Sequence, residues 1–395
     1  MAITISELLR LKSTQSFKLV AGAKGLSKQV DMIDMLDFGW DRQQEYSLTY
    51  YGNDRLFDER SFVISSLMFA RENPNKLYET IVRLIRCGVV GLAYKTVFYH
   101  EMPQDVQELA DRAGFVIFRI DSNVTYREII LDVSNAIKLN RDIAESAEYL
   151  SQLLFEKLNE EEVAALASKI SPHFRGNSKI VLIVPETEKD VFSVDRVIRN
   201  FRLYEEYRKK VVLCGYTASA FPGIALIATM DEKDISKFDV VINNALSLCG
   251  IAPKTVLMAY SNIHHTFTAL NKCVIEASEA LTACKVLNKT SVQYNELGTL
   301  SLLIPTADNP YVRTYMQDYL KPILGNEESM KTAIVLVQAN GDFDLAANIM
   351  CLHKNTLRYR INKIHMQLSP VLTYEAFYEH LAIAIKIYLI CRARN

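Results

Sequence analysis

A short cationic segment near the carboxyl end of the chain has the residue types that bind nucleic acid. From Lys354 to Ile364, Leu357, Ile361 and Ile364 recur at intervals of four and three, which places them on one face of a helix. The opposite face carries Lys354, Asn355, Arg358, Tyr359, Asn362 and Lys363, with Arg360 at its edge. A short helix with an apolar back and a cationic, amide-bearing front fits the major groove of DNA.

A second short helix is expected just before this segment. Ala346, Ala347, Ile349 and Met350 are small or apolar, so a helix here could lie close to its partner. Cys351–His353 interrupt the pattern and would form the turn. Many helix-turn-helix units carry glycine where this chain has Cys351, because the turn can require a positive φ.

The expected roles follow from position along the second helix. Its first residues lie closest to base edges and phosphates, later residues follow on the exposed face, and basic residues further along contact phosphates. We therefore expect Lys354, Asn355 and Thr356 to open the interface, Arg358 and Tyr359 to follow, and Arg360 and Lys363 to bind phosphates.

Residues 352–364 resemble the most characteristic run of the PucR/CdaR group of bacterial transcription regulators, and residues 336–341 resemble the helix before that motif. The resemblance implies a DNA-binding transcriptional regulator whose partner is double-stranded DNA. One such helix binds modestly, so we expect a homodimer that contacts two half-sites about one helical turn apart. On charge alone a solvated surface is the commoner explanation of such a basic amphipathic helix.

The amino-terminal third alternates strand-like and helical runs. Strand-like segments at 62–64, 89–94 and 115–118 are separated by helical segments at 74–87 and 103–113, which end at Gly88 and Gly114. This alternation predicts a parallel sheet covered on both faces. Residues 6–11 are expected to form a short helix capped by Thr4 or Ser6. Residues 4–121 resemble the amino-terminal domain of the PucR family, which implies an effector-sensing or regulatory domain.

A parallel sheet binds ligands beyond the carboxyl ends of its strands. Ser65, Ser66 and Lys95 follow two predicted strand ends, and Thr49 lies in the preceding loop. A lysine in this place could pair with an anionic small-molecule effector. An exposed lysine beside strand-end hydroxyls is the alternative interpretation.

Residues 127–162 contain no Gly or Pro and are predicted to form one continuous helix, with Glu160–Glu162 as a solvated helix start. A 3,4 alternation typical of a coiled-coil seam runs along it. Such a seam would connect the domains and contribute to dimerisation, whereas packing on its own domain is the alternative. The seam residues are Ile130, Val133, Ile137, Asn140, Ala144, Ala147, Ser151, Leu154 and Leu158.

The middle of the chain is predicted to be α+β, with strands at 179–185, 211–214 and 225–228, helices at 194–207 and 264–287, and short strands around 300–304. It resembles a degenerate GGDEF-like domain, over residues 241–242, 250–252 and 294–298 and at Ala277, Ala280 and Ala283. Active cyclases of that fold need a Gly-Gly-acid-Glu turn and metal-binding carboxylates. Residues 239–244 offer only Asp239, so the domain is expected to be non-catalytic.

Length and these patterns predict a multidomain chain: residues 1–125 an α/β domain, 126–165 a helical connector, 166–324 the α+β domain and 325–395 an all-α helix-turn-helix domain. Net charge is −1, yet residues 330–395 hold eight Lys/Arg against four Asp/Glu, which leaves +4 on this end. A neutral protein with one basic module suits a regulator whose DNA contact is confined to that module.

The sequence shows no constellation for catalysis, metal binding or cofactor binding. The seven cysteines are scattered without a C-x-x-C pair, which indicates reduced thiols in a cytoplasmic protein. His264 and His265 would point to different faces of a helix and suit no zinc site. G-x-S-x-G, H-E-x-x-H and G-x-G-x-x-G motifs are missing. Two alternatives stay open: a small-molecule-converting α/β enzyme, and a scaffold that binds a protein through its last helices.

Overall fold

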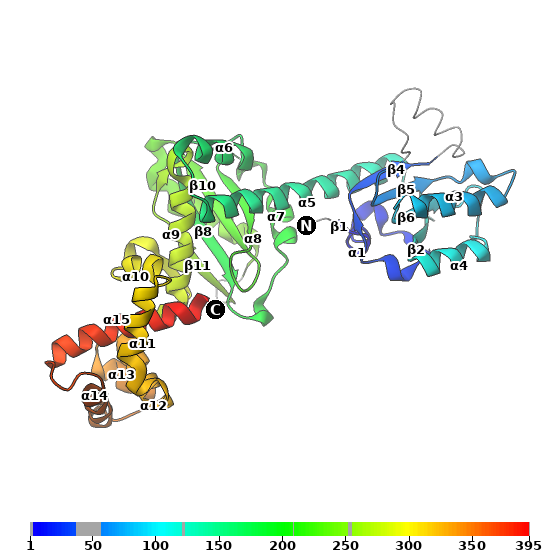
Figure 1. Ribbon diagram of the computed structural model, residues 1–395. Helices are drawn as coiled ribbons and strands as arrows, with labels where there is room; N and C mark the ends of the chain where they lie inside the picture. Colours follow the sequence, from blue (N-terminus) through cyan, green and yellow to red (C-terminus); the bar gives the residue numbers. More distant parts are fainter. Residues whose placement is uncertain (1–2, 37–56, 121–122, 208, 252–254, 395) are drawn as a thin grey trace. The chain divides into compact units, whose positions relative to one another are not determined.

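The computed structural model of the protein describes residues 3–36, 57–120, 123–207, 209–251 and 255–394 (Figure 1). The chain divides into two compact units, Met1–Glu145 and Ser146–Asn395. Each unit has its own sheet and its own core, so each is described by itself.

The first unit contains a five-stranded sheet in the order β2 (Phe17–Ala21), β7 (Val116–Ile120), β6 (Gly91–Lys95), β5 (Ser61–Ser65) and β4 (Met32–Met35). Strands β5, β6 and β7 are parallel, as the sequence predicts. Strand β4, which was not predicted, is also parallel to β5, and β2 adds an antiparallel edge. The helices α3 (Asn75–Arg86) and α4 (Gln104–Ala113) occupy the predicted positions. Helix α1 (Ile5–Leu8) begins with a capping box between Thr4 and Glu7.

Both faces of this sheet carry apolar side chains, because consecutive residues of its parallel strands are apolar and successive side chains point to opposite faces. Val63, Leu92 and Ile117 pack with α3 and α4 in one cluster. Phe62 and Phe118 lie on the other face in a cluster with α1 and the start of α5 (Tyr126–Phe155). The predicted two-sided covering of the sheet is therefore confirmed.

The short edge strand β2 is followed directly by Gly22, a position at which any side chain would clash. Gly22 has φ +78°, and a Cβ on it would lie 1.9 Å from the carbonyl oxygen of Phe115. Its amide donates a 2.6 Å hydrogen bond to Oδ1 of Asp111. The close approach fixes β2 against the segment that leads from α4 into β7.

The predicted helical connector differs from the structure in two ways. It is not continuous: α5 ends at Phe155, and α6 (Glu160–Ile170) begins after a capping box between Asn159 and Glu162, so the acidic run is the helix start that the sequence indicates. The buried stripe is also shifted by one residue from the predicted seam. Only Val133 and Asn140 of the seam residues are buried, and the other buried positions include Ile129, Ala136, Ile143, Leu150 and Leu153.

The second unit contains an antiparallel sheet built on β8 (Asn177–Pro185), β9 (Val211–Tyr216), β10 (Gly223–Met230) and β11 (Val256–Tyr260), with β13 (Ser291–Gln293) parallel to β11. The strand order is β13-β11-β8-β10-β9, and the short β12 (His264–His265) pairs with β8. Helices α7 (Val194–Phe201) and α8 (Phe238–Cys249) follow β8 and β10. Helix α9 (Thr266–Leu287) packs with α6 on the face that bears Ile180, Leu182 and Ala259.

Two predictions for this region are wrong. The run at 300–304, predicted as strand, is helix α10 (Leu300–Thr306). Leu300 and Ile304 are buried one helical turn apart, while Leu302 is exposed. The periodicity of such a short apolar run cannot distinguish strand from helix, and here its packing favours the helix. The helix predicted to reach residue 207 ends at Phe201 and continues only as a short 3₁₀ turn, Glu205–Tyr207.

Five helices complete the second unit: α11 (Pro310–Leu324), α12 (Glu327–Gln338), α13 (Phe343–Met350), α14 (Lys354–Leu368) and α15 (Tyr374–Arg394). They share one apolar core, to which α15 contributes Phe377 and Leu381. Further along α15, Ile390 is buried in the core of the sheet instead. One helix thus joins the helical core to the sheet within this unit (Figure 1).

Candidate nucleic-acid interface

Helices α13 and α14 are joined by a three-residue turn, as the sequence predicts. Cys351 ends α13 with φ +53°, so the turn does require the left-handed conformation that glycine usually supplies. Asp342 caps α13 by accepting hydrogen bonds from the amides of Asp344 and Leu345, which lower the pKa of its carboxyl. His353 caps α14, since its Nδ1 accepts from the amide of Asn355 at 3.3 Å.

The predicted apolar back of α14 is confirmed. Leu357, Ile361 and Ile364 are buried in the helical core. The prediction for α13 holds only in part: Ala346 and Ala347 are buried, but the side chain of Ile349 is 55% exposed and cannot contribute to close packing. Close approach of α13 to its neighbours therefore depends on the two alanines.

The front of α14 presents polar side chains to solvent. Asn355, Thr356, Arg358 and Lys363 are exposed, and Tyr359 is 71% exposed. The guanidinium of Arg358 lies over the ring of Phe343, 5.9 Å from its centroid. That contact orients a long side chain which would otherwise sample many rotamers.

Two of the expected DNA-binding cations are paired with carboxylates. Nζ of Lys354 lies 2.5 Å from Oδ2 of Asp344 on α13, and Nη2 of Arg360 lies 2.8 Å from Oε1 of Glu328 on α12. The side chain of Arg360 is only 26% exposed. Arg360 is thus turned toward α12, whereas Lys363 stays on the exposed face.

Several supporting residues were not identified from the sequence. His365 near the end of α14 stacks on Phe377 of α15, with 4.3 Å between ring centroids, and its Nε2 lies 3.0 Å from the carbonyl oxygen of Leu372. Phe343 and Glu328 position Arg358 and Arg360 from other helices. His353 alone had a local signal, because a polar residue just before an amphipathic run is a candidate cap.

The residues expected to bind an effector do not share one environment. Ser65 is buried, and its hydroxyl lies 2.5 Å from the carbonyl oxygen of Leu36 and accepts from the amide of Leu67. Ser66 Oγ accepts from the amide of Met68. Nζ of Lys95 lies 5.1 Å from the centroid of the Tyr126 ring. Thr49 lies outside the described residues. Ser66 and Lys95 keep side chains that a ligand could reach, whereas Ser65 serves the fold.

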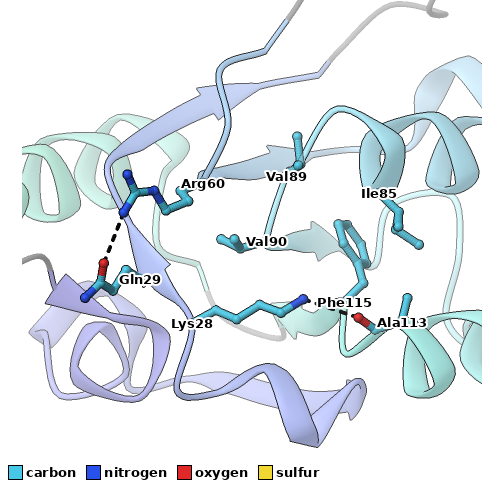
Figure 2. A pocket seen from close by; sticks show the side chains of 9 residues that line it. Lys28, Gln29, Arg60, Ile85, Val89, Val90, Ala113 and Phe115 are labelled. Carbon is cyan, nitrogen blue, oxygen red and sulfur yellow. Dashed lines mark hydrogen bonds between the residues drawn. The ribbon is translucent and has the colours of Figure 1, made fainter.

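A cavity of about 410 Å³ in the first unit lies at the other edge of the sheet (Figure 2). Arg60, Val90 and Phe115, which line it, each come immediately before a parallel strand. Its two cations are already engaged: Lys28 donates to the carbonyl oxygen of Ala113 at the end of α4, and Arg60 binds Gln29 and Asp31. Because helix carboxyl ends favour cations, we assign Lys28 to helix capping.

Potential metal ligands and thiols are spread over the described residues, where Cys351 is exposed and Cys87 and Cys391 are partly exposed. Among them, no three His, Cys, Asp or Glu side chains are grouped to hold a metal ion. Asp239 lies 3.0 Å from Nζ of Lys179 and forms an ion pair with it. Burial raises the pKa of the thiols of Cys214, Cys249, Cys273 and Cys284 to about 12, so they stay protonated and poorly nucleophilic. No helix in the described ranges is both long and apolar enough to span a membrane.

Comparison with known proteins bears mainly on the first unit. Residues 7–137 match the purine catabolism regulatory protein-like family, PucR. No curated protein sequence matches the chain. The crystal structure of a regulator of polyketide synthase expression from Bifidobacterium adolescentis matches 62% of this chain and 97% of its own, with 15% identity and a TM-score of 0.32, a similarity too low to support any argument. Of this chain, residues 7–137 are thus similar to the PucR family.

Proposed function

We propose that the protein is a DNA-binding transcriptional regulator that contacts DNA through α14. The observation that carries the proposal is the exposed polar face of α14, with Asn355, Thr356, Arg358, Tyr359 and Lys363 in front and a fully buried apolar back. The match of residues 7–137 to the PucR family supports a regulatory role.

In this proposal the first turns of α14 enter the major groove. Asn355 and Arg358 are the side chains suited to paired hydrogen bonds, with adenine and guanine respectively. Lys363 binds a phosphate and carries little sequence information. Lys354 and Arg360 contact phosphates only after exchanging Asp344 and Glu328 for the DNA backbone, so part of their binding energy offsets the lost ion pairs.

The remaining features of the proposal concern the other domains. The strand order β13-β11-β8-β10-β9, with helices after β8, β10 and β11, supports a GGDEF-like domain. The turn between β9 and β10, residues 217–222, contains no carboxylate, which supports a non-enzymatic role. We further propose a homodimer that contacts two half-sites, and an effector that binds the first unit near Ser66 and Lys95.

Arg358 provides the test, with Arg392 as a matched control. Both guanidinium groups lie 5.9 Å from the centroid of an aromatic ring, Phe343 or Tyr388, and both are exposed, but only Arg358 is on α14. We expect Arg358→Ala to weaken specific binding of the protein to its own upstream DNA by about 1–3 kcal/mol in a salt titration. Arg392→Ala should bind like the unaltered protein. Equal affinity of both variants would remove Arg358 from the interface.

A further inference from the structure

A cavity of about 780 Å³ in the second unit has a wall of mixed charge. It lies among the turn after β9, the outer face of α9, the carboxyl ends of α5 and α15 and the segment after α10. Its volume is within the usual range for small-molecule sites. Neither the proposed DNA contact nor the proposed effector site of the first unit uses it.

Two cations and two anions line this cavity, so the wall is neutral overall. Arg394 and Asp308 satisfy each other through a short ion pair, and Nη2 of Arg394 also donates to the carbonyl oxygen of Ile304 at 2.8 Å. Lys285 is exposed, and its Nζ donates to the carbonyl oxygen of Ala393 at 3.0 Å. An ammonium group has three donors, so Lys285 retains capacity for a ligand anion.

Glu279 is the other carboxylate of this wall, and it forms no ion pair with another described residue. Burial raises the pKa of its carboxyl, and a hydrogen bond with Tyr294 and the positive charge of Arg394 oppose that shift. Its Oε2 is buried and, within the described part of the chain, has no hydrogen-bond partner. A buried carboxylate oxygen without a donor is costly, and a ligand that brings a donor relieves that cost.

The rest of the lining offers hydroxyls and apolar surface. The hydroxyl of Tyr216 lies 3.2 Å from that of Ser278, and Thr282 follows one turn further along α9. On the apolar side, Phe155 is 70% exposed and Ile275 is also exposed. Such a lining accepts a ligand with a polar end and an apolar side chain.

We propose that this cavity binds a small zwitterion of the amino-acid class. Its ammonium group pairs with Glu279, its carboxylate with Lys285, and its side chain contacts Phe155 and Ile275. A neutral wall with one available charge of each sign selects a ligand with the same balance over a plain amine or a plain acid.

Occupancy of the cavity would act on the DNA-binding helices through α15. Ala393 and Arg394 are in the last turn of α15, and the same helix carries Phe377 and Leu381 into the core behind α14. A ligand carboxylate bound to Lys285 shares the ammonium group with the carbonyl oxygen of Ala393 and so changes the contact that holds the end of α15. This consequence, unlike the binding site itself, rests on the proposed function.

Binding is tested on the full chain by saturation-transfer NMR and calorimetry with three probes of one carbon skeleton. L-Leucine carries both charges, isoamylamine lacks the carboxylate, and 4-methylpentanoate lacks the ammonium group. We expect leucine to bind and each analogue to bind about tenfold or more weakly, because a charge-assisted hydrogen bond is lost. Alanine, serine and phenylalanine extend the probe set to other side-chain sizes.

The variant Glu279→Gln keeps the shape of the side chain and removes its charge. It should weaken binding of the amino acids about tenfold while leaving the protein folded by circular dichroism. Glu161→Gln, an exposed change at the start of α6, is the control and should bind as the unaltered protein does. The proposal is overturned if none of the four amino acids binds, or if Glu279→Gln binds them as well as the control does.

A second measurement separates the site from its consequence. DNA affinity is compared with and without leucine, in the unaltered protein and in Glu279→Gln. A leucine-dependent change in the unaltered protein alone supports coupling through α15. Binding of leucine with unchanged DNA affinity would overturn the coupling and leave the site. A protein that binds leucine but no DNA would count against the proposed function instead.

Discussion

Helices α5 and α14 both carry apolar residues at intervals of three and four, but only in α14 do the residues singled out from the sequence form the buried face of the helix. In α14 the three predicted residues are the three buried ones. In α5 the predicted stripe passes through Ile130 and Ile137, whereas the buried stripe passes through Ile129 and Ala136. The helices differ in how each apolar residue is flanked.

In α14, Leu357 stands between Thr356 and Arg358, and Ile361 between Arg360 and Asn362. Only one face can be buried without burying charge. In α5, apolar residues come in adjacent pairs, so two neighbouring stripes are equally apolar. The choice is then made by the core that each part of α5 packs against, the first unit's at its start and the second unit's at its end, and no local pattern contains that information. The pairs are Ile129–Ile130, Ala136–Ile137, Ile143–Ala144 and Leu153–Leu154.

The largest loss of stability should come from a substitution on the buried face of α14. Leu357→Ala removes a fully buried side chain from the helical core and leaves a cavity, so we expect a loss of about 2–5 kcal/mol in the free energy of unfolding of the second unit. Denaturant titration followed by circular dichroism measures it. Lys363→Ala, on the exposed face of the same helix, should change stability by less than about 0.5 kcal/mol. Similar losses in both variants would mean that α14 does not pack as described.

A smaller change in stability should show which of the two apolar stripes of α5 is buried. Ile129 is fully buried and Ile130 only partly, so removing one methylene from each compares two adjacent stripes with identical chemistry. We expect Ile129→Val to lower the free energy of unfolding of the first unit by about 0.5–1.5 kcal/mol, and Ile130→Val by less.

A larger loss of unfolding free energy in Ile130→Val than in Ile129→Val would mean that the stripe through Ile130 is the buried one. Sedimentation of the same variants adds a second readout, because the partly exposed stripe through Ile130 and Ile137 is also the predicted dimer seam. A weaker dimer in Ile130→Val with unchanged stability would favour that seam.

The smallest effect concerns the turn that links α13 to α14. Cys351 adopts φ +53°, a conformation that costs a residue with a Cβ about 1–2 kcal/mol. Glycine avoids that cost but loses more backbone entropy on folding, so Cys351→Gly should stabilise the second unit by about 0.5 kcal/mol. Thermal unfolding would show a small rise in midpoint. A fall would mean that the cysteine side chain contributes contacts beyond its backbone conformation.

Local sequence patterns encode part of this fold, and contacts between distant residues determine the rest. The parallel sheet and α13–α14 were predictable because turns and caps such as Gly88, Gly114 and Asp342 stand beside clear periodic runs. Strands β11 and β13 and helix α10 were not, because their pairing and packing partners are distant in sequence. Glu328 and Glu279 are exposed or half-buried helical glutamates with no local signal, and only the fold brings them to Arg360 and to the cavity wall.

The ion pairs of Lys354 with Asp344 and of Arg360 with Glu328 have a consequence for how such a protein would search a genome. If α14 binds DNA as proposed, the phosphate backbone is the sole source of attraction on unrelated sequences, and two carboxylates beside Lys354 and Arg360 weaken it. A genome offers on the order of 10⁶ or more competing sites. A helix whose cations are partly paired with carboxylates before binding would dissociate sooner from non-specific sites. It would stay bound only where contacts with the bases offset the loss of these ion pairs.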